Sequence, residues 1–155
     1  MGGVRLSRED AWRYVAAAHT GVLTSLRRDG VPVSLPVWFV ALDQRLYVSG
    51  PARTKKVARI RRDSRVAFLV ESGARWEELV GVHFTGTASI VTDAAVVDRV
   101  ARLFTEKYGA YRTPREQMPI ATRANYESAT ATIEIIPDER ILSWDNARLS
   151  MPDPS

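Results

Sequence analysis

Short turns between β-rich segments are the feature that most restricts the fold of the first fifty residues. Residues 21–26, 33–41 and 46–49 are rich in β-forming side chains. Arg28-Asp29-Gly30 supplies a tight hairpin turn between the first two segments, and Asp43-Gln44 turns the chain into the third. Parallel neighbours would need crossovers of about a dozen residues or more. The three segments are therefore predicted to form an antiparallel meander.

Two further strands are predicted in the middle of the chain. Residues 66–71 form a continuous apolar run, which is expected to be buried on both faces. Residues 80–91 form a longer strand with interior glycines at Gly81 and Gly86. Glycines inside so long a strand indicate a bulge, a barrel bend or the close approach of a ligand.

The last two strands complete the predicted fold. They span residues 130–136 and 141–144, around a Pro137-Asp138 turn. The total is about seven strands and three or four helices, mostly with antiparallel connections. We predict a mainly β, α+β fold built on a small antiparallel barrel. Residues 1–155 are expected to form a single domain whose tail, residues 150–155, is frayed.

Helices are predicted where a capping residue precedes apolar residues at helical spacing. The predicted helices are residues 8–18 after Ser7, a helix to about residue 62 after Thr54, and a helix from Thr92-Asp93 to Tyr108-Gly109. Residues 110–126, which contain two prolines, are expected to form a loop and a short helix.

Cysteine and histidine usage excludes several chemistries. The chain has no cysteine, so disulfides, thiolate catalysis, iron–sulfur clusters and cysteine-based zinc sites are excluded. Its two histidines, His19 and His83, argue against a histidine-rich metal centre, and no metal site is predicted. The sequence has no apolar signal-peptide core and no run of about 18 apolar residues. We expect a cytoplasmic protein with no membrane partner.

The positive charge is concentrated in one segment. Residues 53–65 carry seven basic residues and one acid, and the rest of the chain carries 15 basic and 17 acidic residues. A non-specific nucleic-acid binder interleaves basic residues with aromatic side chains, and this segment has none. We therefore predict no nucleic-acid partner. A compact phosphate-bearing ligand fits the pattern. The alternatives are a solvated helix face and nucleic-acid binding through residues 53–65, which would weaken steeply with salt.

One strand–turn–helix arrangement favours anion binding. Strand 46–49 is followed by Gly50-Pro51-Ala52, and Arg53-Thr54-Lys55-Lys56 then begins a helix. The free backbone N–H groups and the positive dipole end of a helix attract anions, and neighbouring cations strengthen that attraction. The chain has no nucleophile elbow, P-loop, zinc-protease or dinucleotide fingerprint. This absence argues against a hydrolase or a nucleoside triphosphatase.

The order of these motifs resembles the pyridoxamine 5′-phosphate oxidase-like split β-barrel family. The matching features are an Asp-Gly hairpin, the run Pro36-Val37-Trp38-Phe39, the strand 46–49, and the basic doublet with Arg61-Arg62-Asp63 downstream. The resemblance covers about residues 21–145. The family includes flavin-binding oxidoreductases and reductases that depend on the deazaflavin F420. The resemblance implies a split β-barrel and an FMN or F420 cofactor.

The resemblance implies cofactor contacts for several short stretches. The family's phosphate-binding basic residues fall on Lys55 and Lys56, with Thr54 as a hydroxyl donor and Arg53 as a helper. The residues implied beside the flavin ring or its chain are Ser34, Leu35, Pro36, Val37, Ser49 and Gly50.

The resemblance also implies a homodimer with the cofactor site at the interface. A residue on the long strand and an aromatic residue near the carboxyl end of the partner chain complete the pocket in similar proteins. His83 and Trp144 are the equivalent positions here.

The implied function is an FMN-binding oxidoreductase that transfers a hydride or electrons to or from a small organic substrate. An F420-dependent reductase is an alternative, in which Arg53, Arg59 and Arg62 would serve the acidic tail of F420. A non-catalytic module that holds a flavin, F420 or haem is another. Residues 148–152 match the oxidase's Arg-Leu-x-Pro signature imperfectly, which argues against a vitamin B6 substrate.

Several aromatic residues admit two interpretations. Trp38 and Trp76 either wall a ring-shaped pocket or belong to the core. Tyr108, Tyr111 and Tyr126 either cover the substrate side of the site or pack the loop that carries them.

Overall fold

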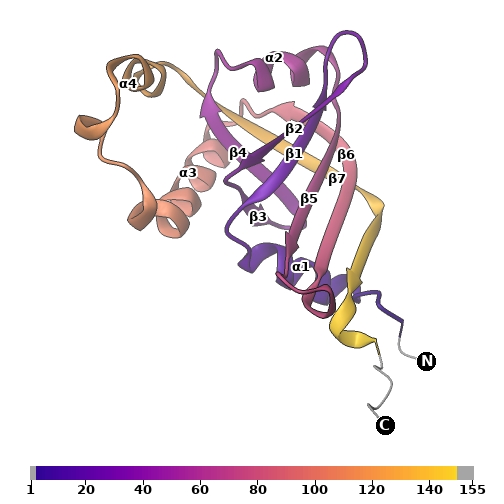
Figure 1. Cartoon of the computed structure of the whole chain (residues 1–155). Coiled ribbons are helices and arrows are strands. Elements are labelled where there is room, and N and C mark those ends of the chain that lie inside the picture. The colour runs from indigo at the N-terminus through magenta and orange to yellow at the C-terminus, as the bar shows by residue number, and fades with distance from the viewer. Residues whose placement is uncertain (1–2, 150–155) are drawn as a thin grey trace.

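One curled sheet organises the protein (Figure 1). The computed structural model describes residues 3–149, so the tail 150–155 lies outside the described residues. In this part of the chain seven antiparallel strands lie in the order β2-β1-β5-β6-β7-β4-β3. Their bounds are β1 Gly21–Leu26, β2 Pro32–Val37, β3 Val40–Leu42, β4 Arg45–Pro51, β5 Arg65–Ser72, β6 Val80–Ile90 and β7 Thr130–Asp145. The predicted α+β split-barrel class is confirmed.

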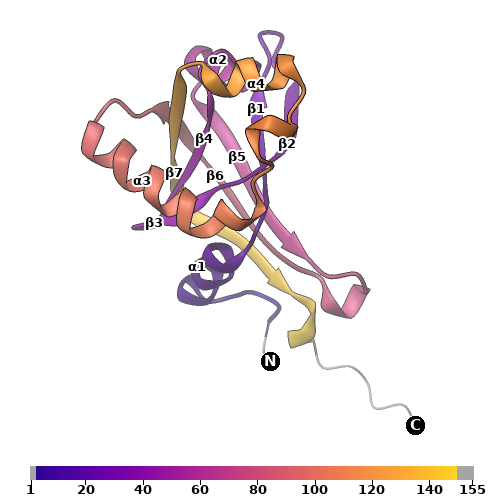
Figure 2. The ribbon, with the colours of Figure 1, turned by 90° about the vertical axis from the view of Figure 1, so that its left-hand side faces the viewer.

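The helices pack around this sheet (Figure 2). They are α1 Arg8–Ala17, α2 Lys55–Arg62, α3 Ala94–Tyr108 and α4 Ile120–Glu127, with short 3₁₀ turns at Trp76–Glu78, Gly109–Tyr111, Arg115–Gln117 and Asn146–Arg148. The predicted caps are confirmed, since Ser7 Oγ accepts from Asp10 N–H, Thr54 Oγ1 from Val57 N–H, and Asp93 from Ala95 and Val96 N–H. None of the helices within residues 3–149 is long and apolar enough to span a bilayer.

The predicted meander is wrong, because residues 33–41 are not one strand. The chain leaves the sheet at Trp38-Phe39, so β2 pairs with β1 alone and β3 pairs with β4 alone. The backbone N–H and carbonyl of Phe39 bond to the buried Tyr108 hydroxyl instead of a strand. Trp38 and Phe39 connect β2 to β3, and these two strands lie at opposite ends of the strand order. The sheet must therefore curl until its edges approach each other, which makes a half-barrel.

The predicted turn at Pro137-Asp138 is also wrong, because residues 130–145 form one strand, β7. The register between β6 and β7 shifts between Phe84 and Gly86, so the extra residues of β7 form a bulge. A Cβ on Gly86 would lie 2.3 Å from the Ile136 carbonyl oxygen, so only glycine permits this approach. Of the three alternatives predicted for the interior glycines of β6, the structure shows a bulge at Gly86.

The core lies inside the curl and is closed by α1 and α2. Trp12 and Val15 of α1 and Val57 and Ile60 of α2 pack against the inner face of the sheet. A second cluster joins α3 to β3 and β4, and consists of Val40, Tyr47, Val100, Phe104 and Tyr108.

Strand β5 is buried on one face only, contrary to the prediction of two buried faces. Val66, Phe68 and Val70 are buried in the core, and Ala67 and Leu69 on the alternate face are partly exposed. An antiparallel sheet commonly buries one face in the core and leaves the other accessible, and β5 follows that pattern.

Candidate functional site

The end of β4 and the start of α2 form the centre of the candidate site. Thr54 caps α2, with its Oγ1 3.4 Å from Val57 N. Because that bond uses the oxygen as an acceptor, the hydroxyl proton is free to be donated to a ligand. The N–H groups of Lys55 and Lys56 belong to the first turn, where a helix supplies no backbone acceptor. The start of α2 therefore carries both free backbone donors and basic side chains.

The charged side chain of Lys56 is half-buried and lies beside β4. Its ammonium group lies 3.5 Å from where a Cβ would stand on Gly50, so the side chain extends over β4. No carboxylate among the described residues forms a salt bridge with it. Burial lowers the pKa of Lys56, and the positive charge of Arg59 lowers it further. A bound anion would restore the stability of the charged form.

The structure brings together two of the residues predicted to contact the cofactor's phosphate or chain, Lys56 and Gly50. Ser49, which precedes Gly50 on β4, is partly exposed, and Thr54 lines the cavity on the outward side of α2. Lys55 is exposed on the first turn of α2, and Arg53 is exposed just before the capping residue Thr54. The glycine at position 50 leaves room for the Lys56 side chain, which a larger residue would contact.

Arg59 cannot serve an acidic tail in the way predicted, because it lies inside the molecule. Its side chain is buried under β1, where Nε donates to Ser25 Oγ at 2.8 Å. The outward side of α2 is different. There Arg53, Arg61 and Arg62, together with Arg28 of the β1–β2 hairpin, line a cavity of about 510 Å³, called the arginine cavity below.

The predicted ring-contact residues of β2 divide between two faces. Val37 is buried in the core, so its side chain is unavailable to a ring on the outer face. Ser34 lies on the outer face, where its hydroxyl is 2.7 Å from that of Thr24. Pro36 lines another cavity, and Leu35 is exposed.

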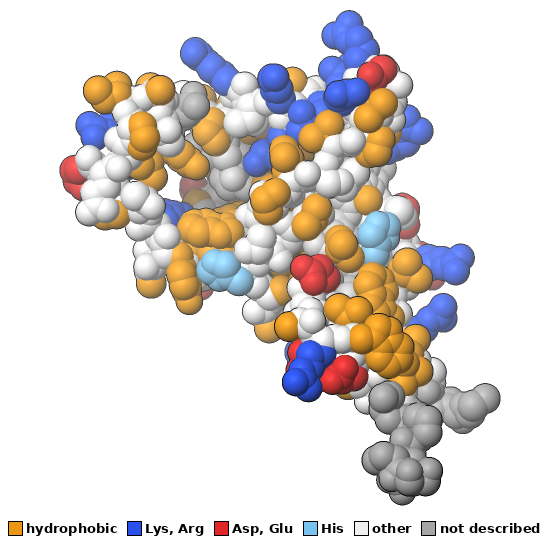
Figure 3. All heavy atoms as spheres, in the orientation of Figure 1, with side chains coloured by type: hydrophobic (Ala, Val, Ile, Leu, Met, Phe, Trp, Pro, Cys, Tyr) orange, Lys and Arg blue, Asp and Glu red, His pale blue; other side chains and the backbone are white. Residues whose placement is uncertain are grey.

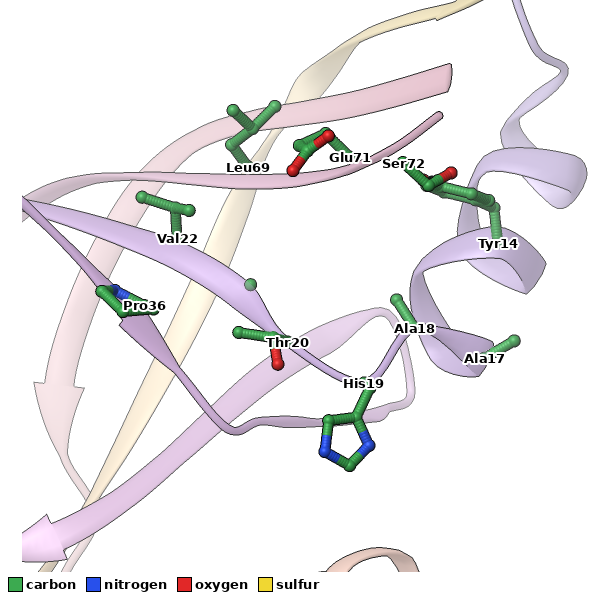
Figure 4. A pocket seen from close by; sticks show the side chains of 11 residues that line it. Tyr14, Ala17, Ala18, His19, Thr20, Val22, Pro36, Leu69, Glu71 and Ser72 are labelled. Atoms are coloured by element: carbon green, nitrogen blue, oxygen red, sulfur yellow. Dashed lines mark hydrogen bonds between the residues drawn. The ribbon is translucent and has the colours of Figure 1, made fainter. Parts of the chain in front are cut away.

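A cavity of about 490 Å³ lies where β1 separates from β5 (Figure 4). These two strands pair only from Val22 to Thr24 on β1, so the chain before Val22 diverges from β5. Glu71 and Ser72 border the cavity on the β5 side, and His19 and Pro36 lie on its other side. Of the predicted cofactor-contact residues, Pro36 alone lines it. A strand separation leaves no pattern in the sequence, so this cavity was not predicted.

His83 and Trp144 lie far from Lys56 within one chain. Pro51, just before α2, pairs with Thr130 at the start of β7, whereas Trp144 is near the other end of that strand. The Trp144 ring packs over Gly81, where a Cβ would be 2.2 Å from it. Gly81 therefore accommodates an aromatic ring of this chain, and not a ligand.

Of the aromatic residues with two interpretations, some are packed beside the core and others are exposed. Trp38 stacks on the buried Tyr108 with ring centroids 4.4 Å apart, so both pack beside the core. Trp76 is 59% exposed, and it lines neither cavity. Tyr111 and Tyr126 are exposed between α3 and β7.

Comparisons with known proteins place this geometry in a family. A conserved hypothetical protein from Mycobacterium tuberculosis is 28% identical, with a TM-score of 0.80 over 100% of this chain and 94% of that one. A FAD-binding protein from Mesorhizobium loti is 18% identical, with a TM-score of 0.67 over 89% and 93% of the two chains. A haem storage protein from Vibrio cholerae is 13% identical, with a TM-score of 0.68 over 88% and 94%.

No curated protein sequence matches the chain. The family model described as pyridoxamine 5′-phosphate oxidase matches residues 9–141, which include every strand up to the second half of β7. This protein therefore belongs to the pyridoxamine 5′-phosphate oxidase family, as the order of its sequence motifs predicted.

Proposed function

We propose that this protein is an oxidoreductase that binds FMN and transfers a hydride or electrons to or from a small organic substrate. The cofactor's phosphate binds at the first turn of α2, and its ring lies along β2. When bound, the flavin supplies the redox chemistry. The protein's own groups hold the phosphate and orient the ring.

The charge of Lys56 carries the proposal. The ammonium group is half-buried, its pKa is lowered by desolvation, and no salt bridge compensates it among the described residues. A cation in this state gains more from an anion than a solvated one does. Thr54 and the free N–H groups of the first turn offer further donors to the same phosphate.

The cofactor is orientated without a titratable catalytic side chain. Ser34 and Pro36 lie on the outer face of β2, along which we place the ring, and Pro36 also lines the cavity between β1 and β5. Backbone and hydroxyl donors near a flavin stabilise the electron density that the ring gains on reduction. Substrate selection then depends on the cavity beside Pro36.

We propose further that two copies associate through the outer face of the sheet. Leu69, His83 and Leu142 are cross-strand neighbours there, and Leu142 is 53% exposed. An apolar sheet face open to water is typical of an interaction surface. In a dimer, His83 and Trp144 of the partner would reach a site that they cannot reach in their own chain.

A paired titration with FMN and F420, followed by absorbance and fluorescence, tests the proposed function. We expect micromolar or tighter binding of one cofactor and loss of about tenfold or more in affinity in Lys56→Ala. The loaded protein is then reduced and mixed with a panel of acceptors. Binding of neither cofactor refutes the oxidoreductase proposal, and binding without turnover favours a storage module.

F420 is the alternative cofactor, and FAD is a second flavin to test because the Mesorhizobium loti relative is described as FAD-binding. A haem-holding module is the other candidate function. It is favoured by the fold shared with the Vibrio cholerae haem storage protein and by the partly exposed imidazole of His83 on the outer face. A haem titration of the wild type and of His83→Ala tests it, since loss of a ligating imidazole shifts the haem absorption band.

A further inference from the structure

The cavity where β1 separates from β5, called the β1–β5 cavity below, lies at the opposite end of the molecule from the basic residues of α2. Lys and Arg side chains gather at the end that carries α2 and the β1–β2 hairpin (Figure 3). The β1–β5 cavity instead borders the last turn of α1, and no Lys or Arg side chain within residues 3–149 lines it. Glu71 supplies the one carboxylate on its described wall. The two ends therefore offer opposite charges to a ligand.

The carboxylate of Glu71 has no partner within the described part of the chain. It forms neither a salt bridge nor a side-chain hydrogen bond there. On the same wall, the Tyr14 hydroxyl donates to Ser72 Oγ at 2.7 Å. Burial raises the pKa of Tyr14, and the negative charge of Glu71 raises it further, so the phenol stays neutral beside the carboxylate. The field in this part of the cavity is therefore negative.

The histidine of the cavity wall does not compensate this charge. The His19 imidazole makes edge contacts with Tyr108 and Tyr111, with ring centroids 5.2 and 4.6 Å apart. Figure 4 shows the His19 ring pointing away from Glu71, which projects from the β5 side. The negative charge thus remains available to a ligand.

An aromatic ring lies beside this carboxylate on the outer face of the sheet. Glu71 pairs with Gly81 across β5 and β6, and Gly81 pairs with Trp144 across β6 and β7. Paired residues place their side chains on the same face. The benzene ring of the Trp144 indole lies over Gly81, so it extends across β6 toward Glu71. A carboxylate attracts a cation by its charge, and an indole does so by its ring electrons.

The rest of the β1–β5 cavity is mostly apolar. Pro36, Val22 and Leu69 are cross-strand neighbours in one row over β2, β1 and β5, and Ala17 and Ala18 close the cavity from α1. Its volume of about 490 Å³ is in the range of small-molecule sites. Pro36 also lies on the face of β2 along which we place the flavin ring. A molecule in this cavity would therefore lie next to the ring.

We propose that the β1–β5 cavity binds the substrate of this oxidoreductase, and that the substrate is an organic cation. Glu71 holds its ammonium group or other protonated nitrogen, and Val22, Pro36 and Leu69 contact its apolar body. Carboxylates and phosphates are repelled from this cavity. The identity of the ligand as a substrate rests on the proposed function, whereas the preference for a cation rests on Glu71 and the cavity alone.

Three probes of similar shape and different charge test this inference, namely benzylammonium, benzyl alcohol and benzoate. Each is titrated into isotope-labelled full-length protein, with and without FMN, and amide NMR shifts report the affinity and the place of binding. We expect benzylammonium to bind about tenfold or more tightly than benzyl alcohol, and benzoate to bind more weakly still. The largest shifts should occur at Gly21, Glu71 and Gly81. In Glu71→Gln the preference for benzylammonium disappears and the affinity for benzyl alcohol is unchanged.

A matched variant controls for general loss of negative charge. Glu77 is a carboxylate in the β5–β6 connection that already pairs with Arg75 at 3.5 Å. Glu77→Gln should therefore leave all three affinities unchanged. Circular dichroism checks that both variants are folded, which is expected because Glu71 and Glu77 are exposed.

Each outcome decides the inference. Equal affinity for benzylammonium and benzyl alcohol, or a preference that persists in Glu71→Gln, overturns the cation site. If FMN still binds in that case, the proposed function stands without it. A preference for benzylammonium that depends on Glu71 supports the cation site. If neither FMN nor F420 binds such a protein, the assignment of this ligand as a redox substrate is overturned together with the proposed function.

Discussion

The two ends of the molecule differ in how many of their basic side chains have a carboxylate partner. At the α1 end, Arg13 pairs with Glu9 and Asp10 at 2.9 and 3.0 Å, and Arg148 pairs with Asp10 and Asp145 at 3.3 and 3.4 Å. At the α2 end, Arg27 pairs with Asp29 at 3.1 Å and Arg65 with Asp63 at 2.8 Å. No described carboxylate pairs with the six other cations there, which are Arg28, Arg53, Lys55, Lys56, Arg61 and Arg62.

This difference teaches that pairing, and not net charge, decides where an anion can bind. A cation that already has a carboxylate partner gains little from a second one, because the field outside the pair is weak. The unpaired cations at the α2 end keep their full field. The local excess of basic residues in the sequence therefore matters because the fold leaves it uncompensated.

Charge reversal at Lys56 should have the largest effect. Lys56→Glu places a carboxylate where the phosphate is proposed to bind, so we expect affinity for FMN to fall about 100-fold or more. The matched change at the paired end, Arg13→Ala, should leave affinity unchanged and alter the free energy of unfolding by about 1 kcal/mol at most. Fluorescence titration measures the affinities. Similar losses in both variants would mean that the two ends do not differ functionally.

The buried hydrogen bonds between Tyr108 and Phe39 are expected to contribute more to stability than the exposed ion pairs do. The Tyr108 hydroxyl accepts from Phe39 N–H at 2.9 Å and lies 2.7 Å from the Phe39 carbonyl oxygen. Tyr108→Phe leaves that N–H buried without a partner, so we expect a loss of about 1–3 kcal/mol in the free energy of unfolding. Urea denaturation measures it, with Tyr111→Phe as the exposed control. A loss no greater than that of Arg13→Ala would contradict this account of the link between β2 and β3.

Lys107 tests whether an unpaired cation alone is enough for ligand binding. Its ammonium group donates to the Phe39 carbonyl at 2.9 Å and lies 4.2 Å from the Phe39 ring centroid. The Phe39 carbonyl and ring already bind the Lys107 ammonium group, so this cation is not available to a ligand. Lys107→Met should therefore leave FMN affinity unchanged. A loss of affinity in this variant would extend the binding site beyond the α2 end.

The same variant has a defined pH signature. Burial lowers the pKa of Lys107 from 10.5 to about 8, so the unfolded chain binds more protons than the folded one between these values. The contribution of Lys107 to stability therefore rises with pH above about 8 and is lowest below it. Urea denaturation at pH 7 and pH 9.5 should show a smaller rise in Lys107→Met than in wild type. Lys56, whose pKa is also lowered, contributes to stability in the same direction.

The smallest predicted effect comes from adding a carboxylate partner at the α2 end, as the cations of the α1 end already have. Ala58 lines the arginine cavity, and it lies three and four residues before Arg61 and Arg62. Ala58→Glu should raise the free energy of unfolding by about 0.3–0.5 kcal/mol through a helical ion pair. Thermal denaturation at low and high salt measures it, and a gain that salt does not reduce would exclude an ion pair.

Local structure was predictable because its signals are local. Ser7, Thr54 and Asp93 cap their helices as expected, since a side-chain oxygen needs only the next two or three N–H groups. Gly30 has a φ of 82°, and Asp43 and Gln44 have positive φ values at the next turn. The basic first turn of α2 follows from the same short-range signals.

The pairing of strands was not predictable from such signals. The sequence favours one strand over residues 33–41, but burial of Phe39 and its bonds to Tyr108 outweigh that preference. Pro137 suggests a turn, but the space over Gly86 lets β7 continue through a bulge. In both places a residue distant in sequence supplies the deciding contact.

The sequence by itself determined the class of fold, the family and the helix turn that carries Thr54, Lys55 and Lys56. Only the tertiary structure decided which cations remain available. Arg59 and Arg61 are two residues apart and identical in type, yet one is bonded to Ser25 inside and the other lines an open cavity. The helix rotation of about 100° per residue separates their directions, and the packing of α2 on β1 decides which direction is buried.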